Sequence, residues 1–177
     1  PDPCNPDPSD AVEAGIHWIV EHQQADGSWT HDHTTGVGTD GLPCPGAGTC
    51  GNPGICNGYI GAPTGWGMIA LLSAGYTPVT GPEYYRQSLC RAINWMMDYQ
   101  RADGSFWGQD TYGTVEHLIA HYAMAEALLA MDMAMTEGPN GGYCSNYIGE
   151  GACSVDPVAL RASVTAALNF TIGDRHP

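Results

Sequence analysis

The sequence predicts an all-α fold of about two and a half helix pairs, with two long loops held by disulfides. Two observations lead to this prediction. Apolar residues recur at helical spacing in five segments, and an aromatic-rich segment in the first of them occurs again in the third. The hydrophobic fraction of 43% is ordinary for a chain that buries a core. With 177 residues, we expect one domain.

The predicted elements follow one another in chain order. A Pro-rich extended arm at 1–9 comes first, with Ser9 as the N-cap of the next helix. The helices are expected at about 10–24, 64–74, 82–100, 114–135 and 156–172. The resulting segments are repeat one at 10–76 with a Cys-rich loop at 30–63, repeat two at 80–135, a Cys loop at 136–155 and a half repeat at 156–177.

Local signals support three of these helices. Pro82 is expected in the first turn of the third helix. Asp156 is the predicted N-cap of the fifth helix, with Pro157 as its first residue. The fourth helix is apolar on nearly every side, which predicts that it is buried or lines a central cavity.

The segment Trp18–Trp29 recurs as Trp95–Phe106 at a constant offset of 77 residues, which indicates an internal duplication. In each copy we expect the first aromatic to pack the helix on its neighbour and the glutamine to bond backbone groups near helix ends. We expect the glycine to turn the chain and the second aromatic to cover the turn. These residues are Trp18, Gln23, Gly27 and Trp29 in the first copy and Trp95, Gln100, Gly104 and Phe106 in the second. A weaker third copy, Ala167–Phe170, aligns with Ala92–Trp95 and stops before its glutamine.

An aromatic-rich helix followed by glutamine, glycine and a further aromatic resembles the QW repeat of squalene–hopene cyclases and the related repeat of protein prenyltransferase β subunits. The resemblance covers both helix pairs and the fifth helix. It implies a partial α/α toroid or solenoid, with the first, third and fifth helices outside and the other two inside. The catalytic motifs of the family are not matched, and two and a half pairs cannot close the ring that these enzymes form.

The charge balance excludes several partners. Five arginines and no lysine face 19 acidic residues, for a formal net charge of −14. Such a surface repels nucleic acid and anionic membranes, and no apolar run approaches the roughly 18 residues that a membrane span requires. The acidity serves solubility, or else cation binding or an acid- or salt-adapted extracellular setting.

Seven cysteines predict an oxidising compartment. We expect three disulfides among six loop cysteines and a buried free thiol at Cys90. Cys144–Cys153 is the expected pair because it closes a short polar loop, and the other four can pair in three ways. These six residues are Cys4, Cys44, Cys50, Cys56, Cys144 and Cys153. A zinc site is the alternative, although the spacings differ from those of structural zinc sites. The cysteines and a start at Pro-Asp-Pro-Cys fit a mature secreted, extracellular or cell-surface protein.

Several residues are candidate ligands of a divalent cation, although no cofactor is required by the sequence. Glu116, His117 and His121 lie on the apolar fourth helix, with the two histidines spaced i, i+4. His31 and His33 flank an aspartate in the first loop. The alternative is that the helical group hydrogen-bonds in the core and that the loop is solvated. The oxygen-rich arm, with Asp2, Asn5, Asp7 and Asp10, is a weaker calcium pattern.

Three functions are consistent with this pattern. The first is a structural protein whose unpaired outer helix is covered by the next copy, which yields a head-to-tail filament or other oligomer. The second is an extracellular module that binds a glycan, peptide or cation through its loops, with Tyr59 and Trp66 contributing. The third is part of a cyclase- or prenyltransferase-like enzyme. Because no catalytic constellation is found, the sequence favours a non-enzymatic homo-oligomer or polymer.

Overall fold

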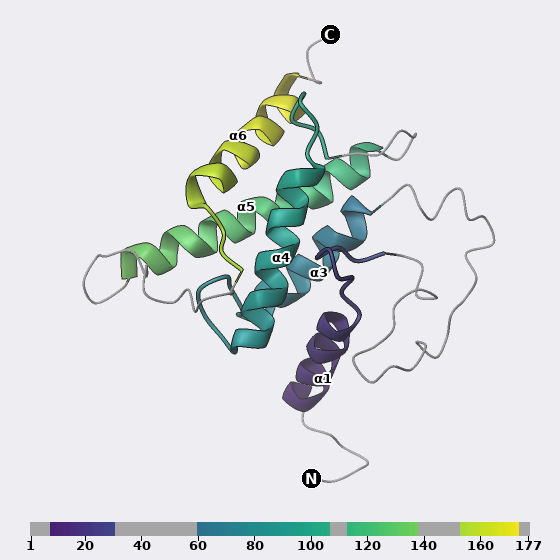
Figure 1. Ribbon diagram of the computed structural model, residues 1–177, viewed down its shortest axis with the longest axis vertical. Coiled ribbons are helices and arrows are strands. Elements are labelled where there is room, and N and C mark those ends of the chain that lie inside the picture. The colour runs from purple at the N-terminus through teal and green to yellow at the C-terminus, as the bar shows by residue number, and fades with distance from the viewer. Residues whose placement is uncertain (1–7, 31–59, 107–112, 138–152, 174–177) are drawn as a thin grey trace, which may run out of the picture.

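The computed structural model describes residues 8–30, 60–106, 113–137 and 153–173 (Figure 1). Every regular element in these ranges is a helix, so the all-α prediction is confirmed there. The helices are α1 (Pro8–Glu21), α3 (Gly61–Ser73), α4 (Glu83–Tyr99), α5 (Gly113–Glu137) and α6 (Pro157–Gly173). Within the described ranges, no helix combines the length and hydropathy that crossing a bilayer requires.

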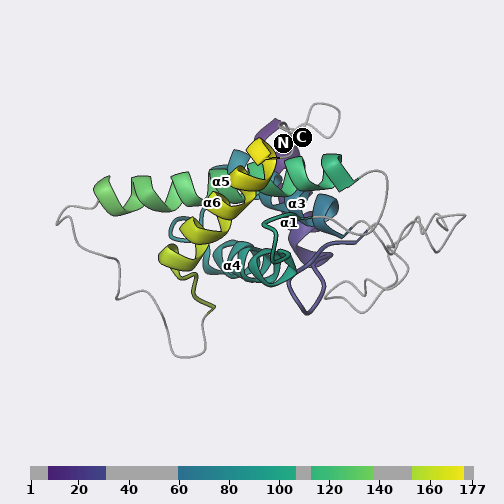
Figure 2. The ribbon, with the colours of Figure 1, turned by 90° about the horizontal axis from the view of Figure 1, so that it is seen from above.

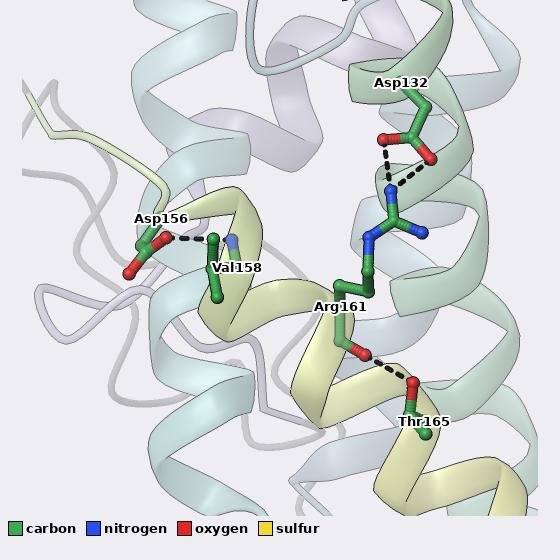
Figure 3. Close-up of polar contacts among 5 residues, drawn as sticks. All are labelled: Asp132, Asp156, Val158, Arg161 and Thr165. Carbon is green, nitrogen blue, oxygen red and sulfur yellow. Dashed lines mark hydrogen bonds and ion pairs between the residues drawn. The ribbon is translucent and has the colours of Figure 1, made fainter.

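The helix ends agree closely with the sequence patterns, with small corrections. α1 begins at Pro8, so Ser9 lies inside its first turn and is not the N-cap. Pro82 is the N-cap residue of α4 and not its first helical residue. The prediction for α6 is confirmed, because the carboxylate of Asp156 accepts a 2.8 Å hydrogen bond from the backbone N–H of Val158 (Figure 3).

The three copies of the repeated segment lie on α1, α4 and α6, here called the repeat helices, and α3 and α5 are the intervening helices. Among the described helices, the two intervening helices make the most extensive contact, and α5 also packs against α6. α4 contacts both intervening helices and lies on one side of them (Figure 2). Glycines allow the close approach of α3 to its neighbours: a Cβ atom at Gly65 would lie 2.8 Å from the side chain of Ile119.

The core joins the inward faces of all five helices and the two turns that follow α1 and α4. Its larger members are Ile16, Val20, Trp29, Met68, Leu71, Tyr85, Leu89, Ile93, Met96, Phe106, Met124, Met131 and Leu160. Trp29 and Phe106, the aromatics that follow the two turns, are both buried in this core. Burial of so many large apolar side chains against one another is the main favourable term in folding.

Two predictions about packing were incomplete. Trp18 is half-exposed, at 49%, and its ring stacks on His22 of its own helix turn. Its counterpart Trp95 is partly buried against the core. α5 is apolar all round but is not buried all round, because one face along its length is exposed. That face carries Val115, Leu118, Tyr122, Leu129 and Met133.

Candidate functional site

The side chain of Gln23 joins the end of α1 to α4. Its amide nitrogen donates to the carbonyl oxygen of Gly27, in the turn after α1, and to that of Ser88 in α4, each at 2.8 Å. Its amide oxygen accepts a 2.6 Å hydrogen bond from the guanidinium of Arg91. We call the two amide-nitrogen bonds a glutamine clasp, because they bind one turn to the next repeat helix.

Gln100 makes the same clasp one repeat later. Its amide nitrogen donates to the carbonyl oxygen of Gly104 at 3.0 Å and to that of Ser163 in α6 at 2.9 Å. Ser88 and Ser163 occupy equivalent positions of the second and third copies, at an offset of 75 residues. The prediction that these glutamines bond backbone groups is confirmed, and the partners are the adjoining turn and the next repeat helix.

Each clasp depends on a glycine that lies against the next repeat helix. Gly27 and Gly104 have φ of 99° and 90°, the left-handed region that favours glycine. A Cβ at Gly27 would meet the carbonyl oxygen of Arg91, and one at Gly104 would meet that of Ala166. In both turns an aspartate, Asp26 or Asp103, accepts hydrogen bonds from the serine two residues later. The turn after α1 and the turn after α4 therefore have the same internal hydrogen bonds and the same close approach to the next repeat helix.

His117 has a structural role that follows from the repeat. The backbone N–H of Trp29 donates to the hydroxyl of Thr64, and that of Phe106 donates to Nδ1 of His117 at 3.1 Å. His117 therefore occupies the place of Thr64 in the second repeat. With Nδ1 accepting, the neutral ring carries its proton on Nε2, 2.9 Å from the hydroxyl of Thr171.

Glu116 and His121 do not join His117 in a common site. Glu116 is buried, and its carboxylate accepts hydrogen bonds from the backbone N–H of Gly61 at 2.7 Å and from the hydroxyl of Tyr99 at 3.1 Å. Burial, and then the nearby Glu116 carboxylate, raise the pKa of Tyr99. His121 lies on the other side, beside the hydroxyl of Thr171, and burial lowers its pKa.

This arrangement does not favour a metal centre on α5. The carboxylate is directed to the start of α3, whereas the two imidazoles meet α6. Across the described ranges, no three His, Cys, Asp or Glu side chains are placed to hold a metal ion together. The loop candidates His31 and His33, and Asp2, Asn5 and Asp7 of the arm, lie outside the described residues, whereas Asp10 lies in the first turn of α1.

The disulfide prediction was wrong for two cysteines. Cys153 is bonded to Cys90, with Cα atoms 6.0 Å apart, so Cys90 is not a free thiol and Cys153 is not paired with Cys144. The segment before α6 crosses α4 at this point. There the side chain of Gln87 accepts from the backbone N–H of Cys153, and Asn94 donates to the carbonyl oxygen of Ser154. Tertiary docking, and not loop length, brings the two sulfurs together. The remaining cysteines, Cys4, Cys44, Cys50, Cys56 and Cys144, lie outside the described residues.

One face of α1 is exposed although the same face is covered in the other two repeat helices. On α4 the face consists of Ser88, Ala92 and Trp95, and on α6 of Ser163, Ala167 and Phe170; all six are buried or partly buried. The equivalent residues of α1 are Ala11, Gly15 and Trp18, and all three are exposed. We call these three residues the α1 open face. A Cβ atom added at Gly15 would meet nothing within 4 Å.

α6 has an open face of a different kind. Leu168 and Ile172 are 46% and 51% exposed, and we call them the α6 open face. The position of Leu168 is occupied by Ile16 in α1 and by Ile93 in α4, and both isoleucines are buried in the core. α6 therefore exposes a position that its two sister helices bury.

No pattern in the sequence predicted the polar cluster of Glu13, Tyr76 and Tyr85. Glu13 accepts hydrogen bonds from the hydroxyls of Tyr76 at 2.5 Å and Tyr85 at 2.6 Å, which connects α1 to α4 and to the turn before it. These bonds hold the pKa of Glu13 below its usual value. The three residues lie far apart in the sequence and no motif links them. A shallow surface depression beside them is lined by Glu13, Ala14, His17 and Tyr85.

Comparison with family models, with curated proteins and with solved structures finds no match to this chain.

Proposed function

We propose that this protein is a secreted structural protein that self-assembles head-to-tail, with the α6 open face of one copy against the α1 open face of the next. The observation that carries the proposal is a comparison of equivalent positions in the three repeat helices. Positions that are exposed on α1 or on α6 are covered in the sister helices, where an adjoining repeat of the same chain packs on them. Each copy would extend an α/α solenoid or partial toroid. Because the two faces differ, the contact is heterologous and generates filaments or rings.

Shape and charge support this pairing. The α1 open face has small residues at Ala11 and Gly15, which leave room for another helix or turn to approach closely. α1 contains three acidic residues and no basic one, whereas α6 contains one arginine and no acidic residue. Arg161 is paired with Asp132 of its own chain, so α6 adds no acidic charge to the contact and does not itself repel acidic α1.

The secreted setting is supported by the Cys90–Cys153 disulfide, because such bonds persist in oxidising compartments. Glycan, peptide or cation binding and enzymatic activity have no comparable support among the described residues. The metal candidates on α5 separate into two directions, and the described residues hold no group of three His, Cys, Asp or Glu side chains that could bind a metal ion together.

The test is sedimentation of the wild-type chain and of two interface variants. The first variant, Leu168→Glu with Ile172→Glu, places negative charges on the α6 open face, where they repel acidic α1. The second variant, Ala11→Arg with Gly15→Arg, places two long side chains on the α1 open face and blocks it. We expect the sedimentation mass of the wild type to increase with protein concentration. The mass of each variant should not increase in this way, because the head-to-tail contact cannot form. Mixing the two variants should restore one contact per pair, because each supplies the face that the other lacks.

The matched control is Val158→Glu, since Val158 is 72% exposed and its equivalent on α4, Glu83, is an exposed glutamate. This control should polymerise like the wild type. A wild-type chain that stays monomeric at micromolar concentration would contradict the proposal. So would mixed variants that recover no association.

A further inference from the structure

α1 lacks a contact that both of its sister helices receive. In α4 the carbonyl oxygen of Ser88 accepts a hydrogen bond from Gln23 of the preceding turn, and in α6 that of Ser163 accepts one from Gln100. The equivalent residue of α1 is Ala11, which is exposed. α1 lies at one end of the series of repeat helices, with α4 between it and α6 (Figure 1). It therefore has the acceptor position of a third clasp, and no turn occupies that position among the described residues.

The α1 open face has the shape that a clasp turn requires. Where the second turn lies against α6, a Cβ atom at Gly104 would meet the carbonyl oxygen of Ala166. The equivalent of Ala166 on α1 is Ala14, which is exposed and borders the shallow surface depression. A turn glycine can therefore approach α1 as closely as it approaches α6. At the three equivalent positions α1 has residues no larger than those of α6: Ala11, Ala14 and Gly15 stand in place of Ser163, Ala166 and Ala167.

The turn after α4 is held together by hydrogen bonds among its own residues. The backbone N–H of Arg101 donates to the carbonyl oxygen of Ser105, and that of Gly104 donates to the carbonyl oxygen of Arg101, each at 2.9 Å. The side chain of Gln100 closes the turn on Gly104, and the carboxylate of Asp103 accepts from Ser105. A short segment thus contains every bond that shapes the turn, so such a turn can dock from outside the chain.

Charge does not oppose a turn of this composition. α1 contains three acidic residues and no basic one. The segment Tyr99–Phe106 contains one arginine and one aspartate, so its formal charges cancel. A docking turn like it therefore meets no net repulsion from α1.

We propose that the α1 open face accepts a glutamine clasp from a separate polypeptide, with the backbone carbonyl of Ala11 as the acceptor. The partner is a chain in which a helix ends in Gln-x-Ala-Asp-Gly-Ser. Both turns of this kind in the present chain already lie on α4 and α6, so the partner brings its own. The consequence rests on the proposed function: a partner on the α1 open face excludes the α6 open face of the next copy and ends the head-to-tail array.

The probe is an acetylated and amidated peptide with the sequence Tyr99–Phe106. It is added to the isotopically labelled full chain whose α6 open face carries the two glutamates, so that head-to-tail contact does not compete. NMR spectra should show saturable shifts of the backbone amides of Ala14 and Gly15 and of the indole N–H of Trp18. A peptide with Gln100→Ala should bind at least about fivefold more weakly, because it lacks the clasp donor.

Two variants of the protein locate the binding site. Ala11→Arg with Gly15→Arg should abolish peptide binding. Val12→Gln should leave it intact, because Val12 is an exposed residue of α1 outside the open face and glutamine is a good helix former. Equal binding of the Gln100→Ala peptide would overturn the proposal, as would shifts confined to residues outside α1. The absence of any saturable shift at millimolar peptide would overturn it too.

The two proposals fail in different ways. A wild type that assembles but does not bind the peptide contradicts only the clasp on α1. A wild type that stays monomeric and binds the peptide contradicts only the head-to-tail contact. Where both proposals hold, the peptide should lower the sedimentation mass of the wild type, because it occupies the α1 open face.

Discussion

The side-chain amide of Gln23 donates a 2.8 Å hydrogen bond to the carbonyl oxygen of Ser88, 65 residues away in the sequence. Gln100 makes the equivalent bond to Ser163, 63 residues away. Each glutamine also bonds its own turn, so it determines both the path of the turn and where the next repeat helix lies. The clasps therefore connect α1 to α4 and α4 to α6.

Replacing either glutamine should destabilise the protein. Gln100→Ala leaves the carbonyls of Gly104 and Ser163 without this donor, and we expect a loss of about 1–3 kcal/mol in the free energy of unfolding. Gln23→Ala should lose at least as much, because Arg91 also loses its acceptor. Urea denaturation measures both. Gln24→Ala is the control, since the side chain of Gln24 makes no hydrogen bond in the described ranges; an equal loss there would contradict the role of the clasp.

The glycines of the repeat should differ in their response to alanine. Gly104→Ala places a methyl group against the carbonyl of Ala166 at a left-handed φ, so we expect a loss greater than about 1 kcal/mol. Gly15→Ala, in the middle of α1 with open space around it, should gain about 0.5–1 kcal/mol. Thermal melts of the two variants should therefore shift in opposite directions. Equal shifts would refute the close approach at Gly104.

The two acceptor serines offer a stabilising substitution. The hydroxyls of Ser88 and Ser163 are buried without a hydrogen-bond partner among the described residues. Ser163→Ala keeps the carbonyl that Gln100 binds and removes an unsatisfied hydroxyl, so the free energy of unfolding should rise by up to about 1 kcal/mol. Urea denaturation provides the measurement, and a clear loss of stability would indicate that the hydroxyl has a partner.

At low pH, protonation of the Glu13 carboxylate should weaken the attachment of α1 to Tyr76 and Tyr85. Hydrogen bonds from Tyr76 and Tyr85 lower the pKa of this carboxylate in the folded protein. The stabilisation it provides is therefore complete above the unfolded-state pKa and is lost as the pH falls through the lower folded-state pKa. Glu13→Gln should lower the melting temperature at neutral pH and reduce the decrease seen on acidification. A wild type and variant with parallel melting profiles from pH 7 to about pH 3 would contradict this assignment.

The Cys90–Cys153 bond should stabilise α6 in particular. The two cysteines are 63 residues apart in the sequence, so the bond closes a long loop. Cys153→Ser should therefore lower the free energy of unfolding by about 2–4 kcal/mol. Hydrogen exchange should rise most at the start of α6. Cys144→Ser is the control: peptide mapping should still recover Cys90 linked to Cys153. Recovery of a Cys144–Cys153 peptide from the wild type would refute the pairing.

Local sequence signals predicted the parts of the fold that local physics determines. The five helices, the Asp156 cap and the turn glycines all follow from interactions within a few residues of each other. Gln23 and Gln100 belong to a recognisable repeat, so the sequence indicated that they matter. It did not indicate which groups of the next repeat helix accept their hydrogen bonds. Ser88 and Ser163 carry no motif, because the group that accepts is a backbone carbonyl.

Features that depend on neighbours were predicted less well. Trp18 and Trp95 have the same sequence context, yet one is exposed and the other is packed on the core, because only α4 has a preceding repeat against it. Cys90 lies in a helical pattern like that of a core thiol, and the docked segment before α6 makes it a disulfide partner. The i, i+4 histidines suggested a metal site, whereas His117 replaces Thr64 in its repeat.

The sequence by itself determined that this protein is helical and duplicated, because helix periodicity, capping and turn chemistry are properties of neighbouring residues. Tertiary structure decided which of the duplicated faces are covered. Equivalent positions of the repeat are buried or exposed according to the element that packs on them, and that element is distant in the sequence. The α1 and α6 open faces, on which the proposed assembly depends, are visible only once the helices have been placed.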